Sequence, residues 1–149
     1  MESGHAAEMP PSRAVVVHDA AQVRQALEAA EGVLPPGVPL PLLSAPGAAH
    51  WLSPALFLAM VARGAEGMTV VPLPVLDCGL APGHALAALR AGCPALVLRA
   101  TCPAFPMLAG AAAEAGAILL GEAPGAFDME RHRPGDPRLR RWLSGGEVT

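Results

Sequence analysis

The sequence predicts an α/β protein in which helices cover both faces of a five-stranded parallel sheet, making a three-layer sandwich. Short apolar runs rich in valine, leucine and alanine alternate with longer segments whose apolar residues recur at helical spacing. Serine, aspartate or proline stands where these helical segments begin. Hydrophobic residues make up 52% of the 149 residues and charged residues 15%. An average protein has about 25% charged residues, so this composition indicates extensive burial.

Five apolar runs are the predicted strands, and a helix is expected between each strand and the next. The expected strands are residues 14–18, 40–44, 71–77, 95–99 and 117–120. Helices are predicted from Asp19 to Glu31, from Ser53 through ALFLAMVARGAE, from Pro82 to Gly92, and from Pro103, capped by Thr101 or Cys102, to Gly116.

Two helical segments have compositions that predict close contacts. Residues 55–62 are apolar almost all round, which is typical of a helix buried on more than one side. In a chain of this length such a helix favours a contact between subunits. Gly110 and the three alanines after it form a small-residue surface suited to close helix packing.

The strand order expected for this alternation is 2-1-3-4-5, the order of flavodoxin-like proteins. The stretch DCGLAPGHALAALRAGCPALVL, residues 77–98, offers an alternative. It resembles one βαβ segment of many (β/α)-barrel enzymes, although the resemblance transfers no catalytic residue. The alternative fold is therefore half of a (β/α)8 barrel, completed or shielded by a second subunit.

The chain divides into three parts by composition. Residues 1–12 are small and polar and predict a disordered tail, 13–122 form a single α/β domain, and 123–149 form a loop followed by a short docking helix. Asp136 and Pro137 mark the start of that last helix. Five of the ten arginines lie from Arg131 to Arg141, and they form either a solvated face or a grip for an anion.

Several functional classes are excluded by what the sequence lacks. The net charge of −3 and the 3% aromatic content argue against a nucleic-acid partner. No apolar run is long enough for a membrane span, and the first residues contain no apolar signal segment, so a cytoplasmic protein is expected. Three cysteines without a CxxC pair disfavour a disulfide framework and a metal site. With no lysine, Schiff-base chemistry is excluded, and the dinucleotide, P-loop and GxSxG motifs are absent.

Candidate site residues follow from the rule that α/β sheets bind ligands at the carboxyl ends of their strands. Asp77 is the favoured catalytic carboxylate because it ends an apolar strand and precedes a Cys-Gly turn, with His18 and Cys78 as its expected partners. His50 in a predicted loop and His84 on a predicted helix surface could turn toward the same edge, although histidines in such positions usually have no special role. The expected ligand-binding residues are Ser44, Gly79, Gly83, Arg99, Thr101 and Cys102.

These features leave two functional hypotheses. The first is a self-associating protein, with a dimer as the first expectation, that binds a small anionic ligand at the carboxyl edge of the sheet. The second is a small lyase, isomerase or hydrolase in which Asp77 acts as acid or base, assisted by His18 or a cysteine. The sequence identifies no cofactor and no particular substrate, and it leaves open whether the protein is an enzyme.

Overall fold

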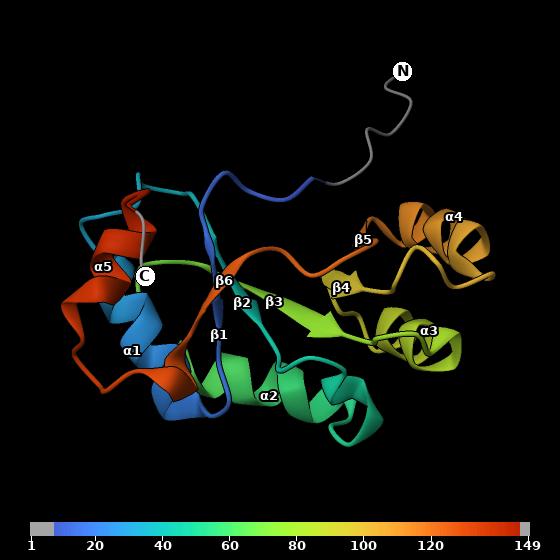
Figure 1. Cartoon of the computed structure of the whole chain (residues 1–149), viewed down its shortest axis with the longest axis horizontal. Coiled ribbons are helices and arrows are strands. Elements are labelled where there is room, and N and C mark those ends of the chain that lie inside the picture. The colour runs from blue at the N-terminus through green and yellow to red at the C-terminus, as the bar shows by residue number, and fades with distance from the viewer. Residues whose placement is uncertain (1–7, 147–149) are drawn as a thin grey trace.

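Six parallel strands form one sheet in the order β5-β4-β3-β2-β1-β6 in the computed structural model, which describes residues 8–146 (Figure 1). The strands are β1 (Ala14–Val16), β2 (Leu40–Leu43), β3 (Pro72–Asp77), β4 (Ala95–Val97), β5 (Ile118–Leu120) and β6 (Ala126–Asp128). The helices are α1 (Ala20–Ala30), α2 (Pro54–Gly64), α3 (Pro82–Arg90), α4 (Phe105–Ala115) and α5 (Pro137–Leu143), with short 3-10 turns η1 (Ala48–His50) and η2 (Met129–Arg131). The α/β class and the parallel sheet are thereby confirmed, and each of the five predicted strands overlaps an observed one, but the predicted count of five is wrong because β6 adds a sixth strand.

Local capping chemistry sets most of the helix starts. A side-chain oxygen of Asp19 accepts the N–H of Gln22 at 2.8 Å at the start of α1, and the Ser53 hydroxyl accepts the N–H of Leu56 at 3.1 Å at the start of α2. The prediction for α4 was wrong by about half a turn, since α4 begins at Phe105 rather than Pro103. The N–H of Phe105 bonds to the Cys102 carbonyl, so the residues between them form a separate turn before the helix.

The predicted strand order 2-1-3-4-5 is wrong, because β2 lies between β1 and β3. Each helical connection leads to the next strand along the sheet and always in the same direction. Right-handed crossovers that never reverse direction place every helix on the same face. The sheet therefore has two layers rather than three, and its first five strands follow one another as the alternative half-barrel would require.

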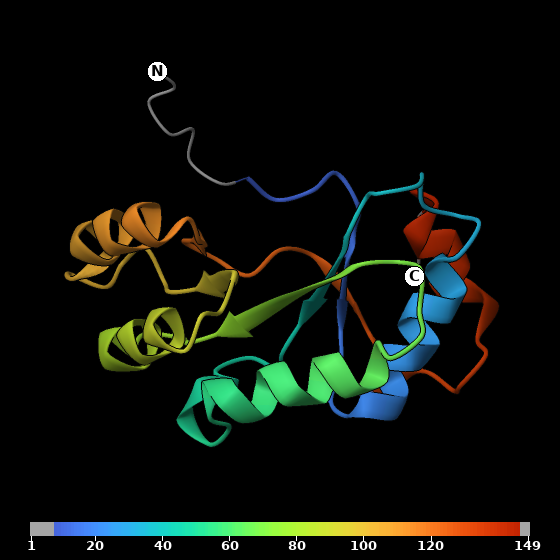
Figure 2. The same ribbon diagram turned by 180° about the vertical axis from the view of Figure 1, so that it is seen from behind.

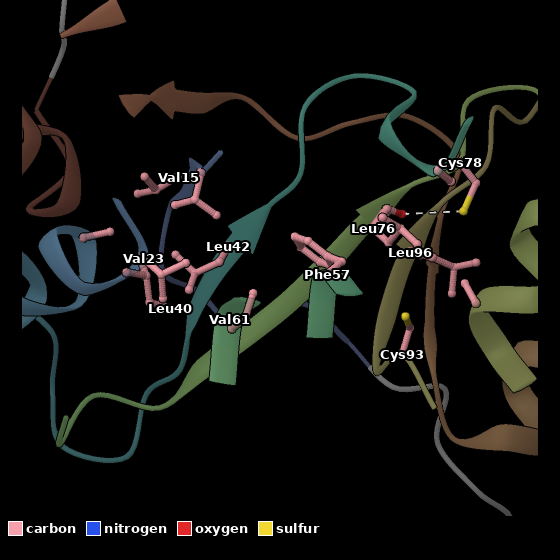
Figure 3. Packing of buried hydrophobic residues seen from close by; sticks show 14 of the residues in the cluster. Val15, Val23, Leu40, Leu42, Phe57, Val61, Leu76, Cys78, Cys93 and Leu96 are labelled. Carbon is pink, nitrogen blue, oxygen red and sulfur yellow. Dashed lines mark hydrogen bonds between the residues drawn. The ribbon is translucent and has the colours of Figure 1, made fainter. Parts of the chain in front are cut away.

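The two faces of the sheet carry separate hydrophobic cores. All five helices contribute to the core on one face, where Phe57, Val61 and Leu76 are among the fully buried side chains (Figure 3). Within residues 8–146 no helix contributes to the core on the opposite face, where partly buried side chains such as Met9 pack. We call this face, which points away from the helices, the inner face. Its centre is one row of paired positions across five strands: Val16, Leu43, Val75, Ala95 and Ile118.

The short connection from β5 to β6 requires the sheet to curl. Five strand spacings of about 4.8 Å separate these two edge strands, or about 24 Å across a flat sheet. Residues 121–125 run from the carboxyl end of β5 back to the amino end of β6, and this length of chain reaches at most about 20 Å. Only a curled sheet brings the edges close enough, and the helices accordingly form an arc with the connection inside it (Figures 1 and 2).

Close packing between α1 and α2 depends on Gly64. A Cβ at this position would lie 2.5 Å from the carbonyl oxygen of Ala20 and 2.5 Å from Cβ of Val23. The close approach predicted for Gly110 is wrong, because a Cβ there would have no neighbour within 4 Å. The close approach at a glycine therefore occurs in α2, while in α4 the buried small residue is Ala112.

The C-terminal segment belongs to the same sheet through β6, which lies in a region expected to be a loop. Its position is fixed from the other side by α5, where the indole N–H of Trp142 donates to the carbonyl of Ala14 at 2.9 Å. The guanidinium of Arg13 lies 4.3 Å from the centre of the Trp142 ring and donates to the carbonyls of Gly145 and Gly146. The proposed division at residue 122 stays a prediction, although both parts share one sheet.

The segment before β1 is described from residue 8 onward. Met9 packs on the inner face, and the Ser12 hydroxyl donates to the carbonyl of Pro39. Most of the predicted disordered tail, residues 1–7, lies outside the described residues. Within residues 8–146, no helix has both the length and the hydropathy needed to cross a bilayer.

Candidate functional site

A pocket of about 340 Å³ opens at the carboxyl edge of the sheet, over the ends of β2, β3 and β4. Asp77 at the end of β3 and the loops that follow the three strands supply its lining. Four residues predicted from the sequence meet there, namely Asp77, Gly79, Arg99 and Thr101, and they are joined by Pro46, Gly47 and Leu80. This edge pocket lies where parallel α/β sheets ordinarily bind ligands.

Asp77 is held rigidly at the end of β3. Its backbone N–H donates to the hydroxyl of Ser44 at 2.9 Å, and its Oδ1 accepts the N–H of Gly79 at 2.9 Å. Its other oxygen, Oδ2, has no hydrogen-bond partner among the described residues. Asp77 is 5% exposed, but no side-chain oxygen in that part of the chain is both fully buried and unpartnered, so Oδ2 keeps some contact with solvent and Asp77 lines the pocket. The carboxylate thus caps a turn and also presents an acceptor to the pocket.

Two of the residues that line the edge pocket are glycines in the left-handed conformation. Gly47 has φ +64° and Gly79 has φ +58°, and a Cβ added to Gly79 would lie 3.8 Å from Cα of Gly47 and 3.6 Å from Nε2 of His50. The ring of His50 meets the ring of His84 edge to face with centroids 5.0 Å apart. This part of the lining therefore carries no side chain, and a pair of histidines lies next to it.

The rest of the edge pocket includes several hydrogen-bond donors beside the apolar Pro46 and Leu80. Arg99 and Thr101 are exposed, and Arg99 has no carboxylate within salt-bridge distance among the described residues. The backbone N–H groups of Gly47, Leu80 and Thr101 likewise donate no hydrogen bond within residues 8–146. Such a set of uncommitted donors suits an oxyanion.

His18 and Cys78, the expected partners of Asp77, are not part of this pocket. His18 lies two strands away because β2 separates β1 from β3, and its Nε2 pairs with Asp128 Oδ1 at 2.9 Å. Cys78 points into the helix-side core (Figure 3). Burial, with smaller contributions from nearby Cys93 and Asp77, raises the pKa of the Cys78 thiol to about 12, so the thiol is protonated and unsuited to nucleophilic attack.

The remaining predicted site residues have other positions. Ser44 is buried and supports Asp77 without lining the pocket. Gly83 is exposed on α3, and Cys102 is buried against the helix-side core. The sequence rule located the correct edge but did not separate residues at the surface of the pocket from those behind it.

The His18–Asp128 pair was missed by the sequence reasoning. Both residues lie at carboxyl ends, of β1 and β6, and are half-buried. Asp128 also accepts the N–H of Glu130, and Glu130 in turn accepts a hydrogen bond from the side chain of Gln22. The signal available in the sequence was Asp128 after the short apolar pair Ala126-Phe127, the same pattern of strand end and carboxylate that identified Asp77.

Within residues 8–146, no three histidine, cysteine or acidic side chains come together as a set of metal ligands. No protein-family model matches this chain, and a search of curated proteins found no significantly similar sequence. Functional inference therefore depends on the geometry of the pockets.

Proposed function

We propose that this protein binds a small ligand carrying an oxyanion next to a hydrogen-bond donor, in the edge pocket between the ends of β2 and β4. The observation that carries the proposal is the convergence of Arg99, the Thr101 hydroxyl and uncommitted backbone N–H groups on one pocket. An oxyanion would accept from these donors, and charge-assisted hydrogen bonds are the strongest available to it.

The carboxylate of Asp77 narrows the ligand class. A simple multivalent anion would be repelled by the negative charge at Oδ2. A ligand whose hydroxyl lies beside its anionic group would donate to Asp77 while its oxyanion faces Arg99. The volume of about 340 Å³ is at the lower end of the range for ligand pockets, which runs from about 300 to 1,000 Å³. Hydroxy acids of a few carbons fit this description.

The second candidate function is a small lyase, isomerase or hydrolase that uses Asp77 as an acid or base. Asp77 in the lining and His50 directly behind Gly79 favour it, because proton transfer commonly uses such groups. In this version His50, which contacts the lining residue Gly79 without lining the pocket itself, would replace His18 and Cys78 as the assisting group, because His18 lies two strands away and Cys78 points into the helix-side core.

Titration calorimetry with glycolate and acetate tests the binding proposal, because these probes differ only by a hydroxyl. We expect glycolate to bind more tightly, Arg99→Gln to weaken both by about tenfold, and Asp77→Asn to reduce the difference between them. Arg90→Gln is the matched control, because this substitution removes the same charge at the C-terminal end of α3, away from the edge pocket. Equal effects of Arg99→Gln and Arg90→Gln, or no binding of either probe, would contradict the proposal.

We further propose that the protein self-associates through the outer face of α2. Leu56 is 62% exposed there, Trp51 just before the helix is 69% exposed, and Arg63 is the only charged residue in α2. Burying such side chains against a second copy removes apolar surface from water. Light scattering should give a dimer mass that Leu56→Glu reduces to that of a monomer, and a monomeric wild type at micromolar concentration would refute the interface.

A further inference from the structure

A second pocket, of about 480 Å³, lies between α1 and the C-terminal segment 127–140. It shares no lining residue with the edge pocket. One wall is the face of α1 carrying Gln25, Glu28 and Ala29, and the other is formed by residues from β6 to the first turn of α5. We name it the α1–α5 pocket.

The base of the α1–α5 pocket is apolar and rigid. Phe127, Met129 and Leu139 line it, and all three are buried parts of the helix-side core. The ring of His132 stacks on Phe127 with centroids 3.9 Å apart and an angle of 24° between the planes. Nδ1 of His132 is 3.0 Å from the carbonyl oxygen of Asp128, which fixes the orientation of the imidazole. A flat or compact apolar group would find a preformed surface here.

The acidic residues of the α1–α5 pocket are already paired with arginines outside it. Oε1 of Glu28 lies 3.7 Å from Nε of Arg24, and Oδ2 of Asp136 lies 2.8 Å from Nη2 of Arg138. Hydrogen bonds from the side chain and backbone of Arg138 lower the pKa of Asp136 to about 2, which marks this carboxylate as ionised and engaged. Neither Arg24 nor Arg138 lines the pocket.

The basic residues of the pocket are not paired in this way. Arg133 and Arg140 both line it, and neither has a carboxylate within 4.0 Å among the described residues. Because an arginine outside the pocket accompanies each of Glu28 and Asp136, the charge summed over these two carboxylates and the four arginines near them is positive. The pocket thus combines an apolar base with two uncommitted guanidinium groups, which bind oxyanions through paired N–H donors.

We propose that the α1–α5 pocket is a binding site for a compact apolar molecule that carries one oxyanion group. The apolar body of the ligand lies on Phe127, Met129 and Leu139, and its anionic end faces Arg133 and Arg140. This assigns a role to part of the arginine-rich segment from Arg131 to Arg141, where Arg133 and Arg140 act on the ligand and their sequence neighbours do not. The site is independent of the edge pocket and of the function proposed for it.

Fluorescence titration of the full chain with 2-naphthoate and 2-naphthol tests this site, because the two probes share an apolar body and only the first is anionic. Arg133→Gln and Arg140→Gln should each weaken 2-naphthoate binding by roughly fivefold, a magnitude typical of one partly exposed charge contact. The matched controls are Arg131→Gln and Arg141→Gln. Each removes the same charge from an arginine that does not line the pocket, two positions before Arg133 and one position after Arg140. Ala29→Met should weaken both probes by filling the pocket.

The outcomes separate the proposed site from general attraction. Tighter binding of 2-naphthoate than of 2-naphthol, lost in the Arg133 and Arg140 variants and kept in their controls, supports it. Equal binding of the two probes, equal effects of Arg140→Gln and Arg141→Gln, or no binding at millimolar concentration overturns it. If Ala29→Met unfolds the protein, as circular dichroism would show, the arginine pairs still decide the question. Arg99→Gln should leave 2-naphthoate binding unchanged, so this test fails or succeeds separately from that of the edge pocket.

Discussion

The contact of α1 with α2 at Gly64 makes the sharpest stability prediction. In Gly64→Ala the new Cβ would lie 2.5 Å from the Ala20 carbonyl oxygen and from Cβ of Val23, and 2.6 Å from Cγ1 of Val23. Optimal separations between such atoms are about 3.5–4.0 Å, so the overlap is about 1 Å on three atoms at once. Neither neighbour can turn away, because one is backbone and Val23 is fully buried. The two helices must therefore move apart.

The expected loss in the free energy of unfolding of Gly64→Ala is the difference between an unfavourable packing effect and a favourable helix-propensity effect. Overpacking of a buried contact typically costs about 1–3 kcal/mol, and an overlap with backbone falls at the upper end. Replacing glycine by alanine in a helix returns up to about 1 kcal/mol, and less at Gly64, the last residue of α2. We therefore expect Gly64→Ala to lower the free energy of unfolding by about 2 kcal/mol.

Gly110→Ala is the matched control, since Gly110 also lies in a helix of 11 residues and its added Cβ would have no neighbour within 4 Å. This variant should gain about 0.5–1 kcal/mol from helix propensity alone. Urea unfolding followed by tryptophan fluorescence measures both variants on one scale. A Gly64→Ala protein as stable as the wild type would refute the packing explanation, whatever the control does.

Two further predictions concern the thiols and the acid stability. Cys78, Cys93 and Cys102 are all buried, and burial raises the pKa of Cys78 to about 12 and of Cys93 to about 11, so a thiol reagent at pH 8 should label none of the three until the protein unfolds. Rapid labelling of any of them in the native state would show that its burial is wrong. Asp136 has its pKa lowered to about 2 by Arg138, so its ionised form stabilises the fold above the ordinary carboxyl pKa and this contribution is lost as the pH falls from about 4 to 2. Urea unfolding at several pH values should show wild type and Asp136→Asn converging over that interval, and a constant difference would contradict the assignment.

Strand bodies and most helix starts were predictable because their causes are local. A parallel strand that is buried on both faces appears in the sequence as a continuous apolar run. The run ALVLRA, residues 95–100, can therefore be identified as a strand without knowing which strands pair with it. The Asp19 cap acts on Gln22, only three residues away. The order of the strands has no such local cause. Strands that are apolar on both faces fit a sheet wound in one direction as well as one that reverses, so the sequence pattern did not separate the two.

The strand β6 was missed because its three residues lie in a segment rich in charge and turn residues. It is stabilised by pairing with β1, and the His18–Asp128 hydrogen bond beside that pairing joins residues 110 positions apart. The wrong strand order, in which β1 was expected next to β3, placed His18 beside Asp77 in the expected site. Asp77, Arg99 and Thr101 were found because the carboxyl-edge rule needs only the direction of the strands, whereas the neighbours of each residue along that edge depend on strand order.

The pairing of β1 with β6 also fixes when the sheet is completed during synthesis. Strands β2 to β5 each add beside a strand made just before, but the outer edge of β1 has no partner until residues 126–128 have left the ribosome. Contacts of such high sequence separation form slowly, and an open strand edge invites pairing with another chain. We therefore expect β6 to be the last strand to join the sheet, with formation of the His18–Asp128 bond, and β6 then replaces β1 as the edge strand on this side.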